Sequence, residues 1–189
     1  MLWHVRNMVR RVRIIALSKY PFIFPLILMS SFISTADLYD QFGESCFSCP
    51  QQFRNFGKRL RFAGRIRTVL CREDNVILKR MLETSSDGDV LVVDGGGSLN
   101  AALIGDVIAG LGARNGWSGV VINGAVRDSA VLREIEFGVK ALGTNPRKSK
   151  KDGNGASDLL VSFAGIDFVP GHWIYCDEDG ILVSERKLV

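Results

Sequence analysis

The order of apolar and polar residues predicts short strands separated by helices. Residues 62–71, FAGRIRTVLC, alternate between apolar and polar side chains, as a half-buried strand does. Residues 89–97, DVLVVDGGG, contain a continuous apolar run that stops at three glycines, which is typical of a strand buried on both faces. The same pattern recurs at 119–123, GVVIN, and VKALG at 139–143 predicts a third strand of this kind.

Helical spacing fills the intervals between these strands. Residues 99–113 predict a helix with one apolar stripe, made of Leu103, Val107, Ile108 and Leu111. A second possibility is that this helix begins near Asp106. Three shorter helices are also expected. One covers residues 34–42 and is capped by Ser34 or Thr35, a second is capped by Asp74 or Asn75, and a third follows Asp128.

These elements together predict an α/β fold. The segment 89–123 reads as a βαβ unit, which implies two parallel strands and a right-handed crossover. The C-terminal part contains four strand patterns, LLVSF, IDFVP, HWIYC and ILVS, with turns between them. We therefore expect a mixed architecture in which a βαβ core carries an appended β layer and the helices lie outside.

Charge is distributed unevenly along the chain. The formal net charge is +4, but residues 1–33 hold five of the 24 basic residues and no acid. The remainder has 19 basic against 20 acidic residues, so the basic pI belongs to the leader and does not indicate nucleic-acid binding. With 189 residues, 47% of them hydrophobic, the chain fits a leader at 1–33 and a single domain at 34–189.

The leader permits several interpretations. It is basic and then apolar, like a targeting peptide, and a cleavage after Ala36 is conceivable although it would cut the first expected helix. Its apolar run from Tyr20 to Met29 is too short to span a bilayer. We favour translation from Met29 and a cytoplasmic protein, with organellar targeting as the alternative.

The cysteines do not indicate a metal or redox site. Cys46 and Cys49 form a lone C-x-x-C, and no paired histidine motif accompanies them. We expect ordinary reduced thiols here and at Cys71 and Cys176. The turn Asp94–Gly97 leaves two possibilities open, an anion site built from backbone amides or a tight turn. The lysines of the basic segment 145–158 are expected on a solvated, mobile loop.

Three polar residues follow the predicted buried strands in a pattern that indicates a site. Arg127 and Asp128 come directly after a strand, and Asp106 precedes them by 21 and 22 positions. Since parallel strands end at one edge of a sheet, two carboxylates and a guanidinium could converge there. Such carboxylates suit Mg²⁺ or Mn²⁺, and the amides of 105–108 would suit a carboxylate ligand. A solvated turn is the plainer alternative.

Four blocks of sequence carry a family resemblance: VLVVDGGGSLNAALIGD, GWSGVVINGAVRDSA, FGVKALGTNPRKSKKDG and PGHWIYCDEDGILVS. Together they resemble the family of the regulator of ribonuclease activity A and its aldolase relatives, from about Thr35 to Ser184. The resemblance implies an α/β/β sandwich of swivelling-domain type and a homotrimer with sites at subunit boundaries.

The resemblance also implies two kinds of function. Some members bind and inhibit a ribonuclease without catalysis. Others are metal-dependent 4-hydroxy-4-methyl-2-oxoglutarate aldolases, which also decarboxylate oxaloacetate through a metal-stabilised pyruvate enolate. The aldolase pattern, an aspartate followed after twenty residues by Arg-Asp, is complete here as Asp106 and Arg127-Asp128.

Residue roles follow from the aldolase members. Asp128 would bind Mg²⁺ or Mn²⁺ directly and Asp106 through water. The α-keto acid would be bound by Arg127 and by the backbone of Gly105, Asp106, Val107 and Ile108. The sequence departs from the pattern at Val131, where many relatives have an acid, and we expect it to lack the C-terminal extension that larger aldolases add.

Overall fold

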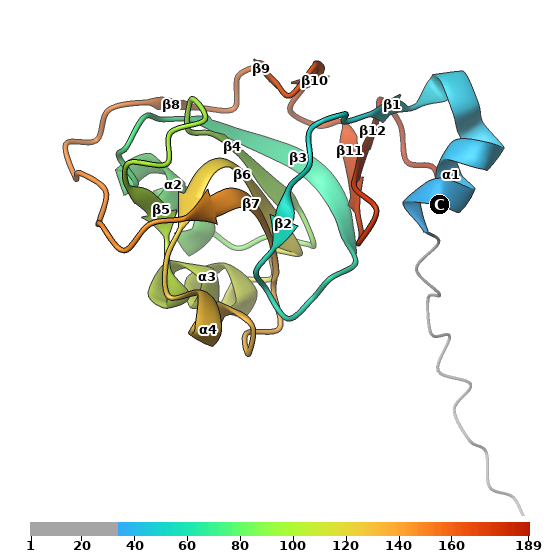
Figure 1. The fold of residues 1–189 in the computed structure, drawn as a ribbon. Coiled ribbons are helices and arrows are strands. Elements are labelled where there is room, and N and C mark those ends of the chain that lie inside the picture. The colour runs from blue at the N-terminus through green and yellow to red at the C-terminus, as the bar shows by residue number, and fades with distance from the viewer. Residues whose placement is uncertain (1–33) are drawn as a thin grey trace, which may run out of the picture. The chain divides into compact units, whose positions relative to one another are not determined.

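The computed structural model describes residues 34–189, so the expectations for residues 1–33 lie outside the described part. Its centre is a ten-stranded sheet (Figure 1). Eight strands follow one another in the order β1 (Phe47–Ser48), β12 (Ile181–Ser184), β11 (Trp173–Cys176), β3 (Phe62–Leu70), β4 (Val90–Asp94), β6 (Gly119–Val126), β7 (Gly138–Thr144) and β2 (Arg54–Asn55). Within the described residues, no helix is long and apolar enough to cross a membrane.

The remaining elements complete the layers. β5 (Ala102–Ile104) pairs with β6, β8 (Ala156–Ser157) pairs with β3, and β9 (Val161–Phe163) forms a separate hairpin with β10 (Ile166–Phe168). The helices are α1 (Thr35–Phe42), the 3-10 turn η1 (Gly43–Ser45), α2 (Val76–Glu83), α3 (Asp106–Arg114) and α4 (Ser129–Leu132).

The parallel core is confirmed. β3, β4, β6 and β7 run parallel, with Val92 opposite Val121 in the register of β4 and β6. All eight residues of β6 are buried. Alternate residues of β4 face different cores: Leu91 and Val93 pack with α2, α3 and α4, whereas Val90 and Val92 pack with β11 and β12. The helices therefore cover one face of the parallel strands, and the C-terminal strands β11 and β12 cover the other. This is the arrangement of an α/β/β sandwich.

The predicted helix over 99–113 is wrong in its first part. Residues 102–104 form β5, Gly105 is extended with φ −134°, and the helix begins at Asp106. β4 ends at Asp94, whereas β6 continues to Val126, so the last residues of β6 take Ala102 and Ile104 as new partners. Leu103 is consequently buried in a strand, and Val107 is 68% exposed instead of lying on a buried stripe.

The first helix begins where its cap predicts. The Ser34 hydroxyl accepts a hydrogen bond from the amide of Asp37 at 3.1 Å. The amide and hydroxyl of Thr35 donate to the carboxylate of Asp177, at 2.6 and 2.8 Å, from a position 142 residues away. Asp177 thus joins α1 to the turn between β11 and β12.

All four cysteines are buried and unpaired. Burial raises the pKa of the Cys71 thiol to about 12, with smaller contributions from the carboxylates of Asp74 and Asp94. Burial also raises the pKa of Cys49 and Cys176. These thiols stay protonated near neutral pH, and because the thiolate is the reactive form, they are poor nucleophiles.

Candidate functional site

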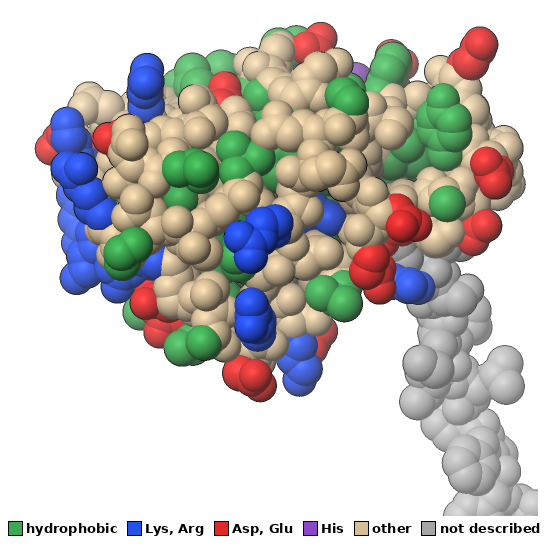
Figure 2. Space-filling model, viewed as in Figure 1, with side chains coloured by type: hydrophobic (Ala, Val, Ile, Leu, Met, Phe, Trp, Pro, Cys, Tyr) green, Lys and Arg blue, Asp and Glu red, His purple; other side chains and the backbone are tan. Residues whose placement is uncertain are grey.

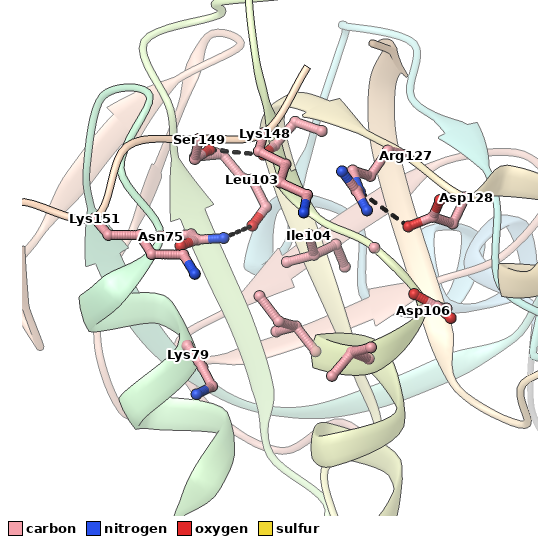
Figure 3. A pocket seen from close by; sticks show the side chains of 14 residues that line it. Asn75, Lys79, Leu103, Ile104, Asp106, Arg127, Asp128, Lys148, Ser149 and Lys151 are labelled. Atoms are coloured by element: carbon pink, nitrogen blue, oxygen red, sulfur yellow. Dashed lines mark hydrogen bonds and ion pairs between the residues drawn. The ribbon is translucent and has the colours of Figure 1, made fainter. Parts of the chain in front are cut away.

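A cavity of about 290 Å³ lies beside the end of β5 and the beginning of α3. All six residues that the sequence predicts for the site line it: Gly105, Asp106, Val107, Ile108, Arg127 and Asp128. Figure 3 shows the side chains of Arg127, Asp128 and Asp106 on one side of the cavity. Parallel pairing brings them together, because β5 ends at Ile104, β6 ends at Val126, and the Arg127 amide donates to the Ile104 carbonyl at 2.9 Å.

Arg127 and Asp128 form an ion pair within the cavity wall. The Nε of Arg127 donates to Oδ2 of Asp128 at 3.0 Å, and the two side chains are 29% and 33% exposed. Asp128 has a left-handed backbone, with φ 53° and ψ 37°, although it is not a glycine. It precedes α4, but its carboxylate does not cap that helix. A strained backbone that directs a carboxylate into a cavity is a feature of functional sites.

Gly105 makes this arrangement possible. A β-carbon at position 105 would overlap Oδ2 of Asp128 and would lie 3.1 Å from Cγ of Arg127. Gly105 is also the cap position of α3 and has no side chain to accept the amides of the first turn. The first hydrogen bond of the helix runs from the Ala109 amide to the Gly105 carbonyl, so the amides before Ala109 remain for a ligand. With the helix dipole, they suit a carboxylate.

The donor chemistry of the cavity fits a hard divalent cation. Asp106 and Asp128 supply carboxylate oxygens, and Mg²⁺ is commonly held by one or two carboxylates with water in its other positions. Among the described residues, no group of three or more His, Cys, Asp and Glu side chains comes together to hold a metal. Val131 lines an adjacent hollow with Asp106 and Val107 and is 49% exposed. The position at which the family resemblance implies a third acid therefore holds an apolar side chain beside Asp106.

A basic wall was missed by the sequence analysis. Lys79 of α2 and the loop residues Lys148 and Lys151 line the same cavity. In Figure 3, Lys79 and Lys151 lie across the cavity from Asp106 and Asp128, and Lys148 lies between them. We define Lys79, Lys148 and Lys151 as the basic wall. The sequence did offer one indication that this loop lies at the site: it follows β7, another parallel strand that ends at this edge of the sheet.

The backbone around Lys148 is attached to β5, which the expectation of a solvated, mobile loop did not include. The Ala102 amide donates to the Arg147 carbonyl at 2.8 Å, and the Ser149 hydroxyl donates to the Ala102 carbonyl at 2.6 Å. The lysine side chains themselves are exposed, as expected. The molecular surface shows a gathering of Lys and Arg side chains near one end of the domain (Figure 2).

The glycine turn after β4 resolves as a tight turn. The amides of Gly95 and Gly97 both donate to the Asn123 carbonyl at 3.1 Å, and the Gly96 amide donates to the Asp94 carboxylate at 2.9 Å. These amides bind within the protein, so the turn does not form the anion site that was the other possibility.

Comparisons with known proteins identify the family and agree with the fold. A family model described as RraA-like, aldolase/RraA, matches residues 35–183. The crystal structure of S-adenosylmethionine:2-dimethylmenaquinone methyltransferase from Geobacillus kaustophilus is 44% identical, with a TM-score of 0.81, and the match covers 82% of this chain and 97% of that one. The RNA-processing inhibitor RraA from Thermus thermophilis is also 44% identical, with a TM-score of 0.79 and coverage of 82% and 93%.

A more distant structure has a similar fold. It is an unusual member of the RNase ES inhibitor RraA protein family from Streptomyces coelicolor, with 26% identity and a TM-score of 0.67. That match covers 81% of this chain and 80% of the Streptomyces chain.

Proposed function

The chain belongs to the aldolase/RraA family, and on that premise we propose that it is a divalent-metal-dependent carbon–carbon lyase. Its substrates would be α-keto acids: it would cleave 4-hydroxy-4-methyl-2-oxoglutarate to pyruvate and decarboxylate oxaloacetate. The observation that carries the proposal is the shared cavity of Asp106, Arg127, Asp128 and the open end of α3.

The residues of the chain would bind the keto acid at two points. The amides of Asp106, Val107 and Ile108 face a carboxylate with the positive end of the helix dipole behind them. The Nε of Arg127 is engaged by Asp128, which leaves its Nη groups to donate to the keto oxygen. Negative charge develops on that oxygen as the carbon–carbon bond breaks, and a fixed guanidinium beside it stabilises the charge.

Asp128 would hold the metal directly, and Asp106 would hold it through water. When bound, Mg²⁺ or Mn²⁺ supplies Lewis-acid stabilisation of the same developing charge. No histidine lines the described cavity, so we assign proton transfer to solvent water.

The basic wall favours substrates that keep a second carboxylate. Aldol cleavage of 4-hydroxy-4-methyl-2-oxoglutarate leaves its remote carboxylate on the departing pyruvate, where Lys148 and Lys151 would pair with it throughout. Decarboxylation instead turns the remote carboxylate of oxaloacetate into neutral CO₂, and an ammonium paired with that group opposes its loss. Binding energy from the basic wall therefore helps aldol cleavage more than decarboxylation.

We also propose a homotrimer in which the apolar surface formed by Val107 and Val131, beside Asp106, contacts a neighbouring subunit. The two side chains are 68% and 49% exposed, and they line one hollow. Exposed apolar residues that gather in this way are typical of subunit contacts. A cytoplasmic location stays a prediction.

The test is pyruvate release from oxaloacetate by the full-length protein with Mg²⁺ or Mn²⁺, measured by a coupled lactate dehydrogenase assay. EDTA and Arg127→Ala should abolish the release above the background of the metal. Arg80→Ala is the matched control, since Arg80 is an exposed arginine of α2 away from the cavity lining. Folded protein without release above background would overturn the proposal.

The Thermus relative favours one other candidate, a protein that binds and inhibits a ribonuclease without catalysis. That function predicts a stoichiometric effect on RNA decay, unchanged by EDTA and by Arg127→Ala. Nothing in an inhibitory surface requires two carboxylates around an open helix end, so we rank it second.

A further inference from the structure

The loop that carries Lys148 and Lys151 is attached to the beginning of α2 through the buried side chain of Asp74. Asp74 is 2% exposed and does not line the cavity. One of its carboxylate oxygens accepts the amides of Asp152, Gly153 and Asn154 at 2.8, 2.8 and 3.2 Å. The other oxygen accepts the Val76 amide at 3.0 Å, at the beginning of α2.

This carboxylate therefore joins the two segments that form the basic wall. Lys151 precedes the three amides directly, and Lys79 lies one turn beyond Val76 along α2. The backbone beside Asp74 adds two further bonds between the same segments, from the Lys150 amide to the Glu73 carbonyl at 2.7 Å and from the Asn75 amide to the Lys150 carbonyl at 3.4 Å. Hydrogen bonds to an ionised acceptor are about twice as strong as neutral ones.

We propose that Asp74 is a positioning residue for the site: its carboxylate holds the loop of Lys148 and Lys151 against the helix of Lys79 and so sets the spacing of the basic wall. The inference rests on the proposed function, because the basic wall is assigned there to the second carboxylate of the substrate. Asp74 touches neither the substrate nor the metal, and it acts through the three lysines.

An amide cannot replace this carboxylate. Asn at position 74 has one oxygen, so it can accept either the three loop amides or the Val76 amide, and its NH₂ group then faces an N–H on the other side. Asp74→Asn should loosen one of the two attachments while leaving the size of the side chain unchanged.

Asp177 offers a matched control. It is also 2% exposed, and its carboxylate accepts the amides of Thr35, Asp179 and Gly180 at 2.6, 3.0 and 3.2 Å. It has no part in the cavity lining. Asp177→Asn therefore removes the same kind of buried anchor far from the basic wall, and it reports the effect of lost stability alone.

The experiment compares both substrates in the wild type and both variants, well below their melting temperatures. Asp74→Asn should raise KM for 4-hydroxy-4-methyl-2-oxoglutarate at least about fivefold and change kcat for oxaloacetate decarboxylation less than about twofold. Asp177→Asn should change neither by more than about twofold. In a Lys148→Ala/Lys151→Ala background the effect of Asp74→Asn on KM should disappear, because residues that act through one another are not additive.

Equal effects of the two variants, or equal falls in kcat with both substrates, would make Asp74 an ordinary stabilising residue and overturn the inference. If Asp74→Asn does not fold, Asp74→Glu carries the same comparison, because it keeps the charge and moves the carboxylate by one methylene. If the wild type cleaves neither substrate, the proposed function fails. Hydrogen exchange tests the role of Asp74 independently of any activity. Asp74→Asn should speed exchange at the amides of residues 152–154, and unchanged exchange would refute that role.

Discussion

The backbone of Gly105 lies so close to the carboxylate of Asp128 that a β-carbon at position 105 would overlap Oδ2 of Asp128. This contact joins the end of β5 to the turn after β6, and the Nε of Arg127 lies 3.3 Å from the same point. The residue before Asp106 is thus a glycine for two reasons: it leaves the first turn of α3 open, and it leaves room for the Arg127–Asp128 pair.

Gly105→Ala should therefore inactivate the protein while leaving the fold intact. The added methyl group would push the carboxylate of Asp128 away from its place beside Arg127. A displacement of about 1 Å at a reacting site can cost about a hundredfold in rate. We expect a loss of that order in metal-dependent pyruvate release, with the circular dichroism spectrum unchanged.

Gly110→Ala is the control for this change. Gly110 lies within α3, and the nearest atom to an added β-carbon is the flexible end of Arg114, at 3.2 Å. Alanine is favoured over glycine inside a helix by about 1 kcal/mol. Gly110→Ala should retain activity and melt at the same temperature or higher, and a similar loss in both variants would contradict the steric argument at Gly105.

Asp128→Asn should separate the charge of residue 128 from its backbone conformation. Asparagine tolerates the left-handed region that Asp128 occupies, at φ 53°. Stability should therefore change by less than about 1 kcal/mol, whereas turnover should fall at least about a hundredfold for want of the carboxylate ligand. Thermal melting and the lactate dehydrogenase assay measure the two effects, and full turnover by the folded variant would remove Asp128 from the site.

Val131→Glu should tighten metal binding. Val131 lines the hollow beside Asp106, at the position where the family resemblance implies an acid. A glutamate at this position would add a third carboxylate beside Asp106, and Mg²⁺ and Mn²⁺ favour carboxylate oxygens. Titration with Mn²⁺ should give an apparent Kd that falls about tenfold relative to the wild type. Ala130→Glu, an exposed neighbour, is the control; an equal gain in both would indicate only a general effect of negative charge.

The N-terminal end of α1 should be required for full stability. Thr35→Ala removes the hydroxyl that donates to Asp177 and should cost about 1.5–3 kcal/mol, the range for hydrogen bonds to charged groups. Deletion of residues 1–36 removes the Thr35 amide bond as well and should lower Tm more than deletion of residues 1–33. Gln41→Ala, on an exposed position of α1, should leave Tm nearly unchanged.

Asp177 should make folding sensitive to acid. Burial by itself would raise the pKa of its carboxyl, but hydrogen bonds from Thr35, Gly180 and Asp179 together bring that pKa below its ordinary value of 3.8. A lowered folded pKa favours the charged form, so this stabilisation is complete above pH 3.8 and is lost as pH falls through the folded pKa. Urea unfolding between pH 2 and pH 6 (roughly the range of carboxyl titration) should show a shallower decline for Asp177→Asn than for the wild type. Parallel curves would refute the assignment.

Local sequence accounts for much of the fold and for the side of the site that holds Asp106, Arg127 and Asp128. Apolar runs such as 119–123 can be accommodated only by burial on both faces, which makes the parallel strands predictable. The spacing of Asp106 and Arg127-Asp128 then leads to one cavity, because consecutive parallel strands end at the same edge.

Local sequence patterns give wrong predictions where a segment's structure depends on hydrogen bonds to residues far away in the sequence. Residues 102–104 have helical spacing but form β5, since the end of β6 has hydrogen-bonding groups that need a neighbour. The basic wall was missed for the same reason: a run of lysines looks like any solvated loop until the bonds to Ala102 and Asp74 are known.

The two buried aspartates show most clearly what local sequence cannot predict. Asp74 and Asp177 each sit in a short polar stretch that predicts a cap or a turn, and each does form one. Their other bonds reach residues 78 and 142 positions away. A hydrogen-bond acceptor does not specify its donor along the chain. Short-range pattern therefore decides where strands and turns occur, and chain packing decides which segments a buried charge holds together.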